Sequence, residues 1–176
     1  MKEQIVQYGI TLYKGIPDSL YEGMLSIFCL GTVILISFCG LKKGLRLSSG
    51  LLMVEYVILI FCSTVFFRIY DEARGHNFSP FWSYYAIQEG KDELLHENIL
   101  NVLVFLPVGV LLGCAFRCIK WGKAILIGCG ISVIIEALQY FYHRGFSETD
   151  DVIHNTLGCM IGYGMYKFVW DFRQSL

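Results

Sequence analysis

The chain has 176 residues, of which 55% are hydrophobic and only 16% are charged. A soluble domain carries charged residues at about a quarter of its positions, so most of this surface must face something other than water. The formal net charge is −1, which leaves no basic excess to neutralise the phosphates of a polynucleotide. Composition therefore excludes disordered, collagenous and nucleic-acid-binding proteins and indicates a membrane protein.

Five apolar stretches of about 20 residues are each long enough to cross roughly 30 Å of hydrocarbon at 1.5 Å per residue. No alternating strand pattern is present, and a lipid-exposed span must satisfy its own backbone hydrogen bonds. The sequence therefore predicts an all-α, polytopic helical bundle that forms a single membrane domain over residues 1–176. The predicted spans are Leu20–Leu41, Leu51–Tyr70, Asn98–Phe116, Ala124–Tyr142 and Val152–Trp170.

Seven cysteines raise the question of a disulfide framework or a zinc site. Both need cysteines in polar loops or at ligand spacing, whereas these lie in or beside apolar runs and form no C-x-x-C pair. We expect all seven to be small packing residues: Cys29, Cys39, Cys62, Cys114, Cys118, Cys129 and Cys159.

Two segments outside the spans carry apolar residues of their own. Residues 1–19 interleave aliphatic and aromatic side chains with polar groups, which is typical of a segment at the membrane interface. The connection 71–97 contains Phe81, Trp82 and Tyr85 and is too apolar to be a solvated tether. We expect it to fold over the outer mouth of the bundle, either as an interfacial helix that anchors the span ends or as a lid over a site.

The connections differ in charge. Basic residues without acidic neighbours follow the first and third spans: Lys42, Lys43, Arg46, Arg117, Lys120 and Lys123. Acidic residues dominate the other two connections, among them Asp71, Glu89, Glu97, Glu148 and Asp151. Because basic loops stay in the cytoplasm, five spans place the N-terminus outside and the C-terminus in the cytoplasm.

Polar side chains lie inside the fourth span, where a charged group costs roughly 2.5 to 3.5 kcal/mol on insertion scales. At 100° per residue, Glu136 shares one face with other polar or small residues: Cys129, Ser132, Gln139, Tyr140 and His143. The opposite face is apolar and is expected to meet lipid; it consists of Ile127, Ile131, Ile134, Leu138 and Phe141.

The neighbouring spans repeat this pattern. Asp151 and Asn155 share a face of the fifth span with two glycines four residues apart, a spacing that allows close helix contact. Glu97, Asn98 and Asn101 share a face at the third span. Span lengths place all of these groups in the outer leaflet, so the three polar faces are expected to converge into one site.

The same residues form spaced motifs. Asn98 begins N-x-x-N-x-x-x-F-x-P-x-G, Glu136 and Gln139 form E-x-x-Q, Arg144 follows, and Asp151 begins D-x-x-x-N-x-x-G-x-x-x-G. In this order they resemble the VanZ-like membrane proteins, with residues 98–170 as the VanZ-like core. The resemblance implies a multi-pass protein of the bacterial cytoplasmic membrane and cell envelope. It also implies a part in antibiotic resistance, because the founding member confers low-level resistance to teicoplanin, an acylated glycopeptide. The family has no established reaction.

Structural explanations remain open for individual residues. Asp150 and Asp151 begin a helix, where carboxylates complement the helix dipole and Ser147 could cap the first turn. The asparagines of the third span could serve solely to form hydrogen bonds with neighbouring helices. Arg144 could be an ordinary snorkelling residue, and Arg68, near the end of its span, is expected to be interfacial.

Two functions follow. In the first, an outer-leaflet pocket binds the headgroup of an amphiphile, either a lipid-linked cell-wall intermediate or a lipoglycopeptide, within a membrane of lipid partners. Arg144 would pair with a phosphate or carboxylate, and the amides would orient it. The predicted ligand-binding residues are Glu136, Gln139, Arg144, Asp151, Asn155, Asn98 and Asn101.

The alternative is a membrane enzyme that cleaves or transfers a phosphate or acyl group, with Glu136 and Asp151 as an acid/base pair assisted by His143 or His154. No nucleophile with an adjacent base supports it. The same four residues have metal-ligand chemistry, but the histidines belong to different helices and no ligand motif joins them. We therefore expect no metal and no cofactor, and the sequence leaves the oligomeric state open.

Overall fold

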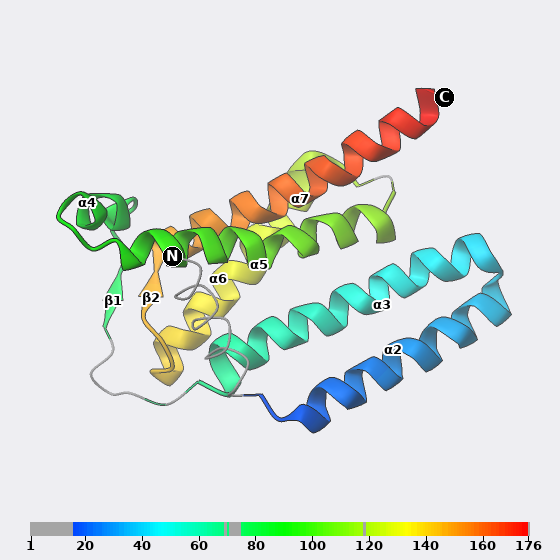
Figure 1. Ribbon diagram of the computed structural model, residues 1–176, viewed down its shortest axis with the longest axis horizontal. Coiled ribbons are helices and arrows are strands. Elements are labelled where there is room, and N and C mark those ends of the chain that lie inside the picture. The colour runs from blue at the N-terminus through cyan, green and yellow to red at the C-terminus, as the bar shows by residue number, and fades with distance from the viewer. Residues whose placement is uncertain (1–15, 69, 71–74, 118, 176) are drawn as a thin grey trace.

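A computed structural model describes residues 16–68, 70, 75–117 and 119–175. Most of the predicted interfacial segment 1–19 lies outside these residues. The described chain is a helical bundle, which confirms the predicted all-α class (Figure 1). Its helices are α2 (Asp18–Cys39), α3 (Leu41–Phe61), the π-helix η1 (Cys62–Phe66), α4 (Trp82–Gln88), α5 (Glu93–Ala115), α6 (Trp121–Tyr142) and α7 (Thr149–Ser175), and two short strands are β1 (His76–Asn77) and β2 (Ser147–Glu148).

Within the described residues, four helices are long and apolar enough to cross a membrane. They are α2, the continuous run of α3 and η1 (Leu41–Phe66), α5 and α6. The predicted fifth span coincides with α7, which has 27 residues but is not among the four, since polar residues and glycines interrupt its apolar run. Four of the five predicted spans thus correspond to helices that are long and apolar enough to cross a membrane. That α7 also crosses the membrane stays a prediction.

The first connection is shorter than the sequence predicts. Gly40 alone joins α2 to α3, with a φ of 75° that favours glycine. Lys42, Lys43 and Arg46 therefore lie in the first turns of α3 and not in a loop.

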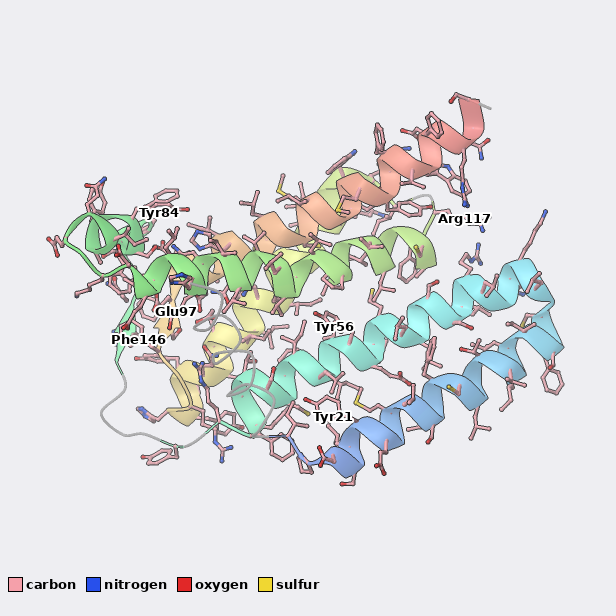
Figure 2. The ribbon with its side chains drawn as sticks, viewed as in Figure 1. Tyr21, Tyr56, Tyr84, Glu97, Arg117 and Phe146 are labelled. Atoms are coloured by element: carbon pink, nitrogen blue, oxygen red, sulfur yellow. The ribbon has the colours of Figure 1, made fainter. Side chains whose placement is uncertain are left out.

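The bundle has chemically different ends (Figure 2). We call the end where α3 and α6 finish and where α5 and α7 begin the acidic end, because Glu93, Glu97, Glu148 and Asp151 lie there. The opposite end is the basic end, with Arg46, Arg117, Lys120 and Lys123. In Figure 2, Glu97 and Arg117 mark the two ends.

The closest helix pair is α5 and α7, which run side by side through the bundle (Figure 1). Glycines permit this approach. A Cβ atom added at Gly158 or Gly162 would collide with the carbonyl oxygen of Val102 or Leu106, and one added at Gly109 would collide with the backbone at Cys159. The small residues of α7 therefore act as the predicted helix contact.

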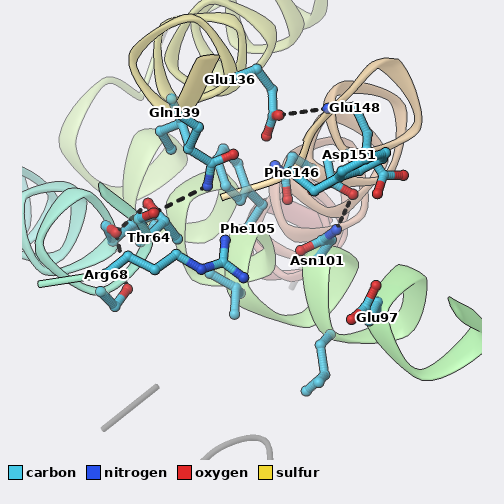
Figure 3. Close-up of a pocket in the computed structure, with 16 residues that line it drawn as sticks. Thr64, Arg68, Glu97, Asn101, Phe105, Glu136, Gln139, Phe146, Glu148 and Asp151 are labelled. Atoms are coloured by element: carbon cyan, nitrogen blue, oxygen red, sulfur yellow. Dashed lines mark hydrogen bonds between the residues drawn. The ribbon is translucent and has the colours of Figure 1, made fainter. Parts of the chain in front are cut away.

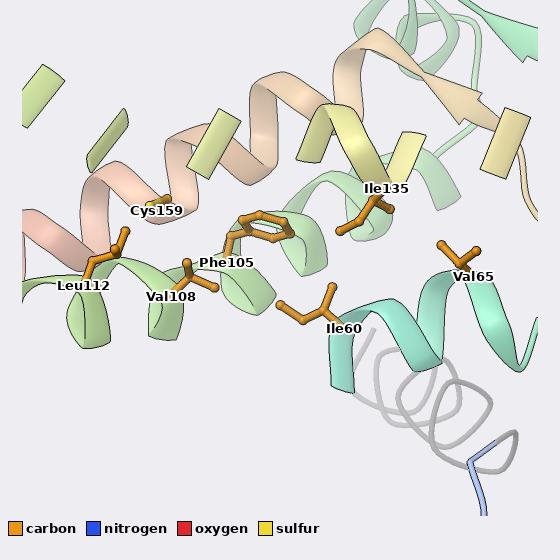
Figure 4. Close-up of a cluster of buried hydrophobic side chains, with 7 residues drawn as sticks. All are labelled: Ile60, Val65, Phe105, Val108, Leu112, Ile135 and Cys159. Carbon is orange, nitrogen blue, oxygen red and sulfur yellow. The ribbon is translucent and has the colours of Figure 1, made fainter. Parts of the chain in front are cut away.

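The apolar core lies where α3, α5, α6 and α7 meet (Figure 4). It consists of Ile60, Val65, Phe105, Val108, Leu112, Ile135 and Cys159. In contrast, α2 has no buried residue and packs against α3 at the edge of the bundle. Its exposed apolar face is the expected surface of a helix in lipid.

The orientation of α6 departs in part from the prediction. Ser132, Glu136 and Gln139 are buried as expected, but Tyr140 and His143 are exposed. Three members of the predicted lipid-facing stripe pack against the core instead: Ile127, Ile131 and Leu138. The difference arises because α6 is covered by η1 on one side and by α7 on another.

The segment between α3 and α5 is fastened to the start of α7. Strand β1 pairs in parallel with β2, placing His76 opposite Ser147 and Asn77 opposite Glu148. The short helix α4 follows and packs against α5. The apolar segment predicted to fold over one end of the bundle thus lies, where described, over the acidic end (Figure 1).

Candidate functional site

A cavity of ≈ 370 Å³ opens at the acidic end between α3, η1, α5, α6 and α7 (Figure 3). Its apolar wall comes from the core, including Ile60, Phe105 and Ile135. The polar residues that line it are Ser63, Thr64, Arg68, Glu97, Asn101, Glu136, Gln139, Glu148, Asp151 and Asn155.

Three carboxylates on one side of the cavity are held by different elements. Glu136 accepts a hydrogen bond on Oε2 from the backbone N–H of Glu148, at 2.9 Å. This bond ties the end of α6 to β2. Asp151 accepts on Oδ1 from the Nδ2 amide of Asn101, at 2.7 Å, which ties α7 to α5. The side chains therefore have defined positions before any ligand arrives.

Glu148 is the carboxylate of this group that lies outside the helices. Burial raises its pKa to about 8, and the nearby negative charge of Asp151 adds to the effect. The indole Nε1–H of Trp82 donates to Glu148 Oε2 at 2.8 Å, which favours the ionised form and opposes the shift. At neutral pH the Glu148 side chain can therefore serve as a proton donor as well as an acceptor.

Arg68 lies across the cavity from these carboxylates, and Gln139 lies between Arg68 and Glu136 (Figure 3). Gln139 donates from Nε2 to the carbonyl oxygen of Thr64, at 3.1 Å. Its Oε1 is buried without a hydrogen-bond partner in the described chain. Arg68 is the one cationic side chain among the described residues that line the cavity.

Five of the seven predicted ligand-binding residues line this cavity: Asn101, Glu136, Gln139, Asp151 and Asn155. Asn155 donates to Ser132 Oγ at 2.8 Å, so its amide also links α7 to α6. The convergence of polar faces from three helices is therefore present.

Asn98 and Arg144 are the two predicted residues that do not line the cavity. Asn98 is buried and donates to Ser83 Oγ at 3.1 Å, because its place on α5 turns it toward α4. Arg144 lies beyond the end of α6, and its Nη1 donates to the carbonyl oxygen of Phe66. Arg144 therefore does not line this cavity, its pairing with an anion stays a prediction, and Arg68 is the cationic side chain that lines the cavity.

Three charged lining residues are absent from the predicted ligand-binding set: Arg68, Glu97 and Glu148. Glu97 precedes Asn101 by four residues and so shares its helix face, and Glu148 stands three residues before Asp151. The sequence spacing of Glu97 and Glu148 could therefore have indicated that both lie near the predicted site. Arg68 follows a π-helix, whose wider turn changes the face that helical periodicity would assign.

Asp150 lies in the first turn of α7, as predicted, and it also has a second structural role. It is fully buried and accepts from the backbone N–H of Ser83 at 2.9 Å, from Ser83 Oγ at 2.5 Å and from the N–H of Phe81. Ser147 does not cap α7, since its hydroxyl donates to the carbonyl oxygen of Glu136. Asp150 therefore fastens α4 to the beginning of α7.

The two candidate histidines do not share a site. His143 is exposed at the end of α6, whereas His154 is buried and hydrogen-bonded to the hydroxyl of Tyr84 at 2.8 Å. In the part of the chain that the structure describes, no group of three or more His, Cys, Asp or Glu side chains could hold a metal ion.

Apolar helices around a polar, acid-rich cavity at one end define a polytopic membrane protein. The VanZ/LLP1 family model matches residues 51–170, so the chain belongs to the VanZ/LLP1 family. It is 30% identical over 131 residues to Protein VanZ of Enterococcus faecium, covering 70% of this chain and 75% of that protein. No solved structure matches the chain. The family match begins before the predicted core at residue 98, and it includes Arg68 and α4.

Proposed function

We propose that this VanZ-family protein binds the headgroup of an envelope amphiphile in the cavity at the acidic end. That end would face outward from the bacterial cytoplasmic membrane, and binding would confer resistance to a lipoglycopeptide such as teicoplanin. The observation that carries the proposal is a polar cavity whose wall includes an amide oxygen, Gln139 Oε1, that is buried and has no partner in the described chain. An unpaired buried acceptor is costly unless a ligand or water completes it.

An amphiphile suits this position better than a soluble ligand. The cavity lies at one end of helices whose outer faces expose large apolar side chains, such as Leu103, Ile134 and Phe141. Such faces are expected to contact lipid. A headgroup in the cavity could therefore keep its acyl chains in the bilayer beside these helices.

The orientation rests on the charge of the two ends. Lys42, Lys43, Arg46, Lys120 and Lys123 all lie at the basic end, and basic residues next to spans favour the cytoplasm. The acidic end then faces outward, where both candidate ligands, the lipid-linked cell-wall intermediate and the lipoglycopeptide, would meet it.

Expression in a teicoplanin-sensitive host tests the proposal. We expect the wild-type chain to raise the minimum inhibitory concentration and Glu136→Gln to abolish that effect, because the substitution removes a cavity charge while keeping the side-chain size. Glu89→Gln is the matched control, since Glu89 is exposed on the outer segment and does not line the cavity. Equal membrane abundance of the three chains is required. If the Glu136→Gln variant protects the host as fully as the wild-type chain, the cavity is not needed for resistance and the proposal is wrong.

Acid–base catalysis on a lipid-linked phosphate or acyl group is a second candidate. The raised pKa of Glu148, about 8, supports it, because a carboxyl that titrates near neutral pH next to Asp151 can donate and accept protons. Purified protein in lipid nanodiscs, given a radiolabelled cell-wall lipid intermediate, separates the two functions. Binding predicts retention without conversion. Catalysis predicts a product whose formation falls about 100-fold or more in Asp151→Asn while retention persists.

A further inference from the structure

The cavity carries opposite charges on its two sides. Arg68 projects from the η1 side, whereas Glu136, Glu148, Asp151 and Glu97 come from α6, β2, α7 and α5 (Figure 3). Among the described residues, Arg68 forms no salt bridge with Glu136, Glu148 or Asp151, although its charge lies near enough to act on Asp151 across the cavity. The two charged sides therefore remain separate across the cavity instead of neutralising each other by direct contact.

Gln139 independently indicates which hydrogen-bonding group a ligand in this cavity must carry. Its Nε2 is fixed on the carbonyl oxygen of Thr64, so the orientation of the amide is set and Oε1 is left for the cavity. Gln139 is only 3% exposed, and Oε1 has no partner among the described residues. A carbonyl oxygen can only accept a hydrogen bond, so the group that completes it must carry an N–H or O–H donor.

We propose that the amphiphile's headgroup carries both an anionic phosphate and a primary ammonium. The phosphate pairs with the Arg68 guanidinium, which offers several N–H donors to its oxygens. The ammonium lies among Glu136, Asp151 and Glu148, where its positive charge favours the ionised form of the Glu148 carboxyl, and it donates one of its N–H groups to Gln139 Oε1. This assignment rests on the proposed binding function and names the chemical class of its ligand.

Other headgroups satisfy only part of the cavity. A phosphate without an amine would leave Gln139 Oε1 unpaired and would meet the carboxylates without a counter-charge. A quaternary ammonium has the charge but no N–H to donate. A cationic lipid without phosphate would leave the half-buried guanidinium of Arg68 beside a like charge. Each deficit is expected to lower affinity about tenfold or more, the value of a charge-assisted hydrogen bond.

Lipid retention measures this selectivity directly. The full chain is reconstituted in nanodiscs containing equal amounts of phosphatidylethanolamine, phosphatidylcholine and phosphatidylglycerol with identical acyl chains, and the lipids that remain after extraction are counted by native mass spectrometry. We expect phosphatidylethanolamine to be enriched about tenfold over each of the other two. Equal retention of the three lipids would overturn the proposal.

Substitutions on each side of the cavity should change the selectivity differently. Glu136→Gln should reduce the preference for phosphatidylethanolamine over phosphatidylglycerol, because it weakens the ammonium site. Arg68→Gln should reduce the preference for phosphatidylethanolamine over a cationic lipid that has a primary amine and no phosphate. The matched controls, Glu89→Gln and Arg46→Gln, alter exposed residues outside the cavity and should leave both preferences unchanged. Unchanged selectivity in the cavity variants would contradict the assignment.

The ammonium and phosphate could belong to a bilayer phospholipid or to a lipid-linked cell-wall intermediate with a free peptide amine. Nanodiscs doped with that intermediate, with its amine either free or acetylated, distinguish the two sources. Retention of the free-amine form alone identifies the intermediate, and retention of both forms alike argues against the ammonium site. If Glu136→Gln abolishes protection from teicoplanin but no lipid preference exists, the proposed function stands and this assignment fails.

Discussion

The attachment of α4 to α7 should depend on Asp150 more than on any other side chain at the start of α7. Asp150 is fully buried, and two of its donors, the N–H and the hydroxyl of Ser83, belong to a residue that is fully buried as well. Leaving a buried donor unpaired costs about 1 to 3 kcal/mol. Asp150→Ala leaves both donors of Ser83 unpaired, so it should lower the free energy of unfolding by about 2 to 6 kcal/mol before any compensation. Relief of the buried carboxylate's own desolvation offsets part of this loss, and we expect a net destabilisation of about 2 to 3 kcal/mol.

A double-mutant cycle isolates the hydroxyl contact. Asp150→Ala, Ser83→Ala and the double variant are unfolded with SDS in mixed micelles, and the coupling energy is obtained from the three shifts in the free energy of unfolding. We expect a coupling of about 1.5 to 3 kcal/mol, the range for a hydrogen bond to a charged group. Asp92→Ala, an exposed acid just before α5, is the control and should have little effect. Coupling below about 0.5 kcal/mol would refute the argument that this bond holds α4 in place.

Three further predictions follow from packing, titration and charge. Gly162→Val should destabilise the bundle by about 3 kcal/mol or more, because its Cβ would meet the backbone of α5, whereas Gly23→Val, with open space around it, should not; thermal unfolding in detergent compares the two. The pKa of Glu148 is raised from 4.5 to about 8, so the folded state keeps its proton after the unfolded state has lost it. Stability should then fall as pH rises from about 4.5 to about 8 and level off above, and Glu148→Gln should flatten this slope in SDS-unfolding measurements. In a cysteine-free background on intact cells, a membrane-impermeant thiol reagent should label a cysteine at Lys91 but not one at Lys43; the reverse pattern would contradict the outward orientation of the cavity.

Local sequence patterns predicted the helices and part of the site, because both depend on periodicity within one element. The 3.6-residue repeat placed Glu136 with Gln139 and Asp151 with Asn155, and these four residues line the cavity. Glycine spacing likewise anticipated the contact of α7, although not that α5 is its partner. A pattern on one helix reports which face is polar and cannot report which helix lies opposite.

The missed features depend on contacts between distant parts of the chain. Arg68 follows the π-helix η1 and lines the cavity, whereas Arg144 does not. The parallel pairing of β1 with β2 joins segments about 70 residues apart and consists of two residues in each strand, too few for an alternating pattern. Asp150 and Asp151 are adjacent and chemically identical, so only the tertiary structure separates the first, bound to Ser83, from the second, which faces the cavity.

That separation also distinguishes structural acids from ligand-facing acids in this fold. Asp150 accepts hydrogen bonds from two backbone N–H groups and one hydroxyl, so its carboxylate is satisfied by the protein itself. Asp151 accepts one amide from Asn101 and lines a cavity whose wall also contains the unpaired Gln139 Oε1. If the acidic cavity served stability alone, apolar residues of similar volume would give a more favourable free energy of folding. The interactions of buried charges rarely compensate for the free energy lost on their desolvation. The polar groups left open around a space of ≈ 370 Å³ therefore support the proposed ligand, whereas the saturated Asp150 is explained by the attachment of α4.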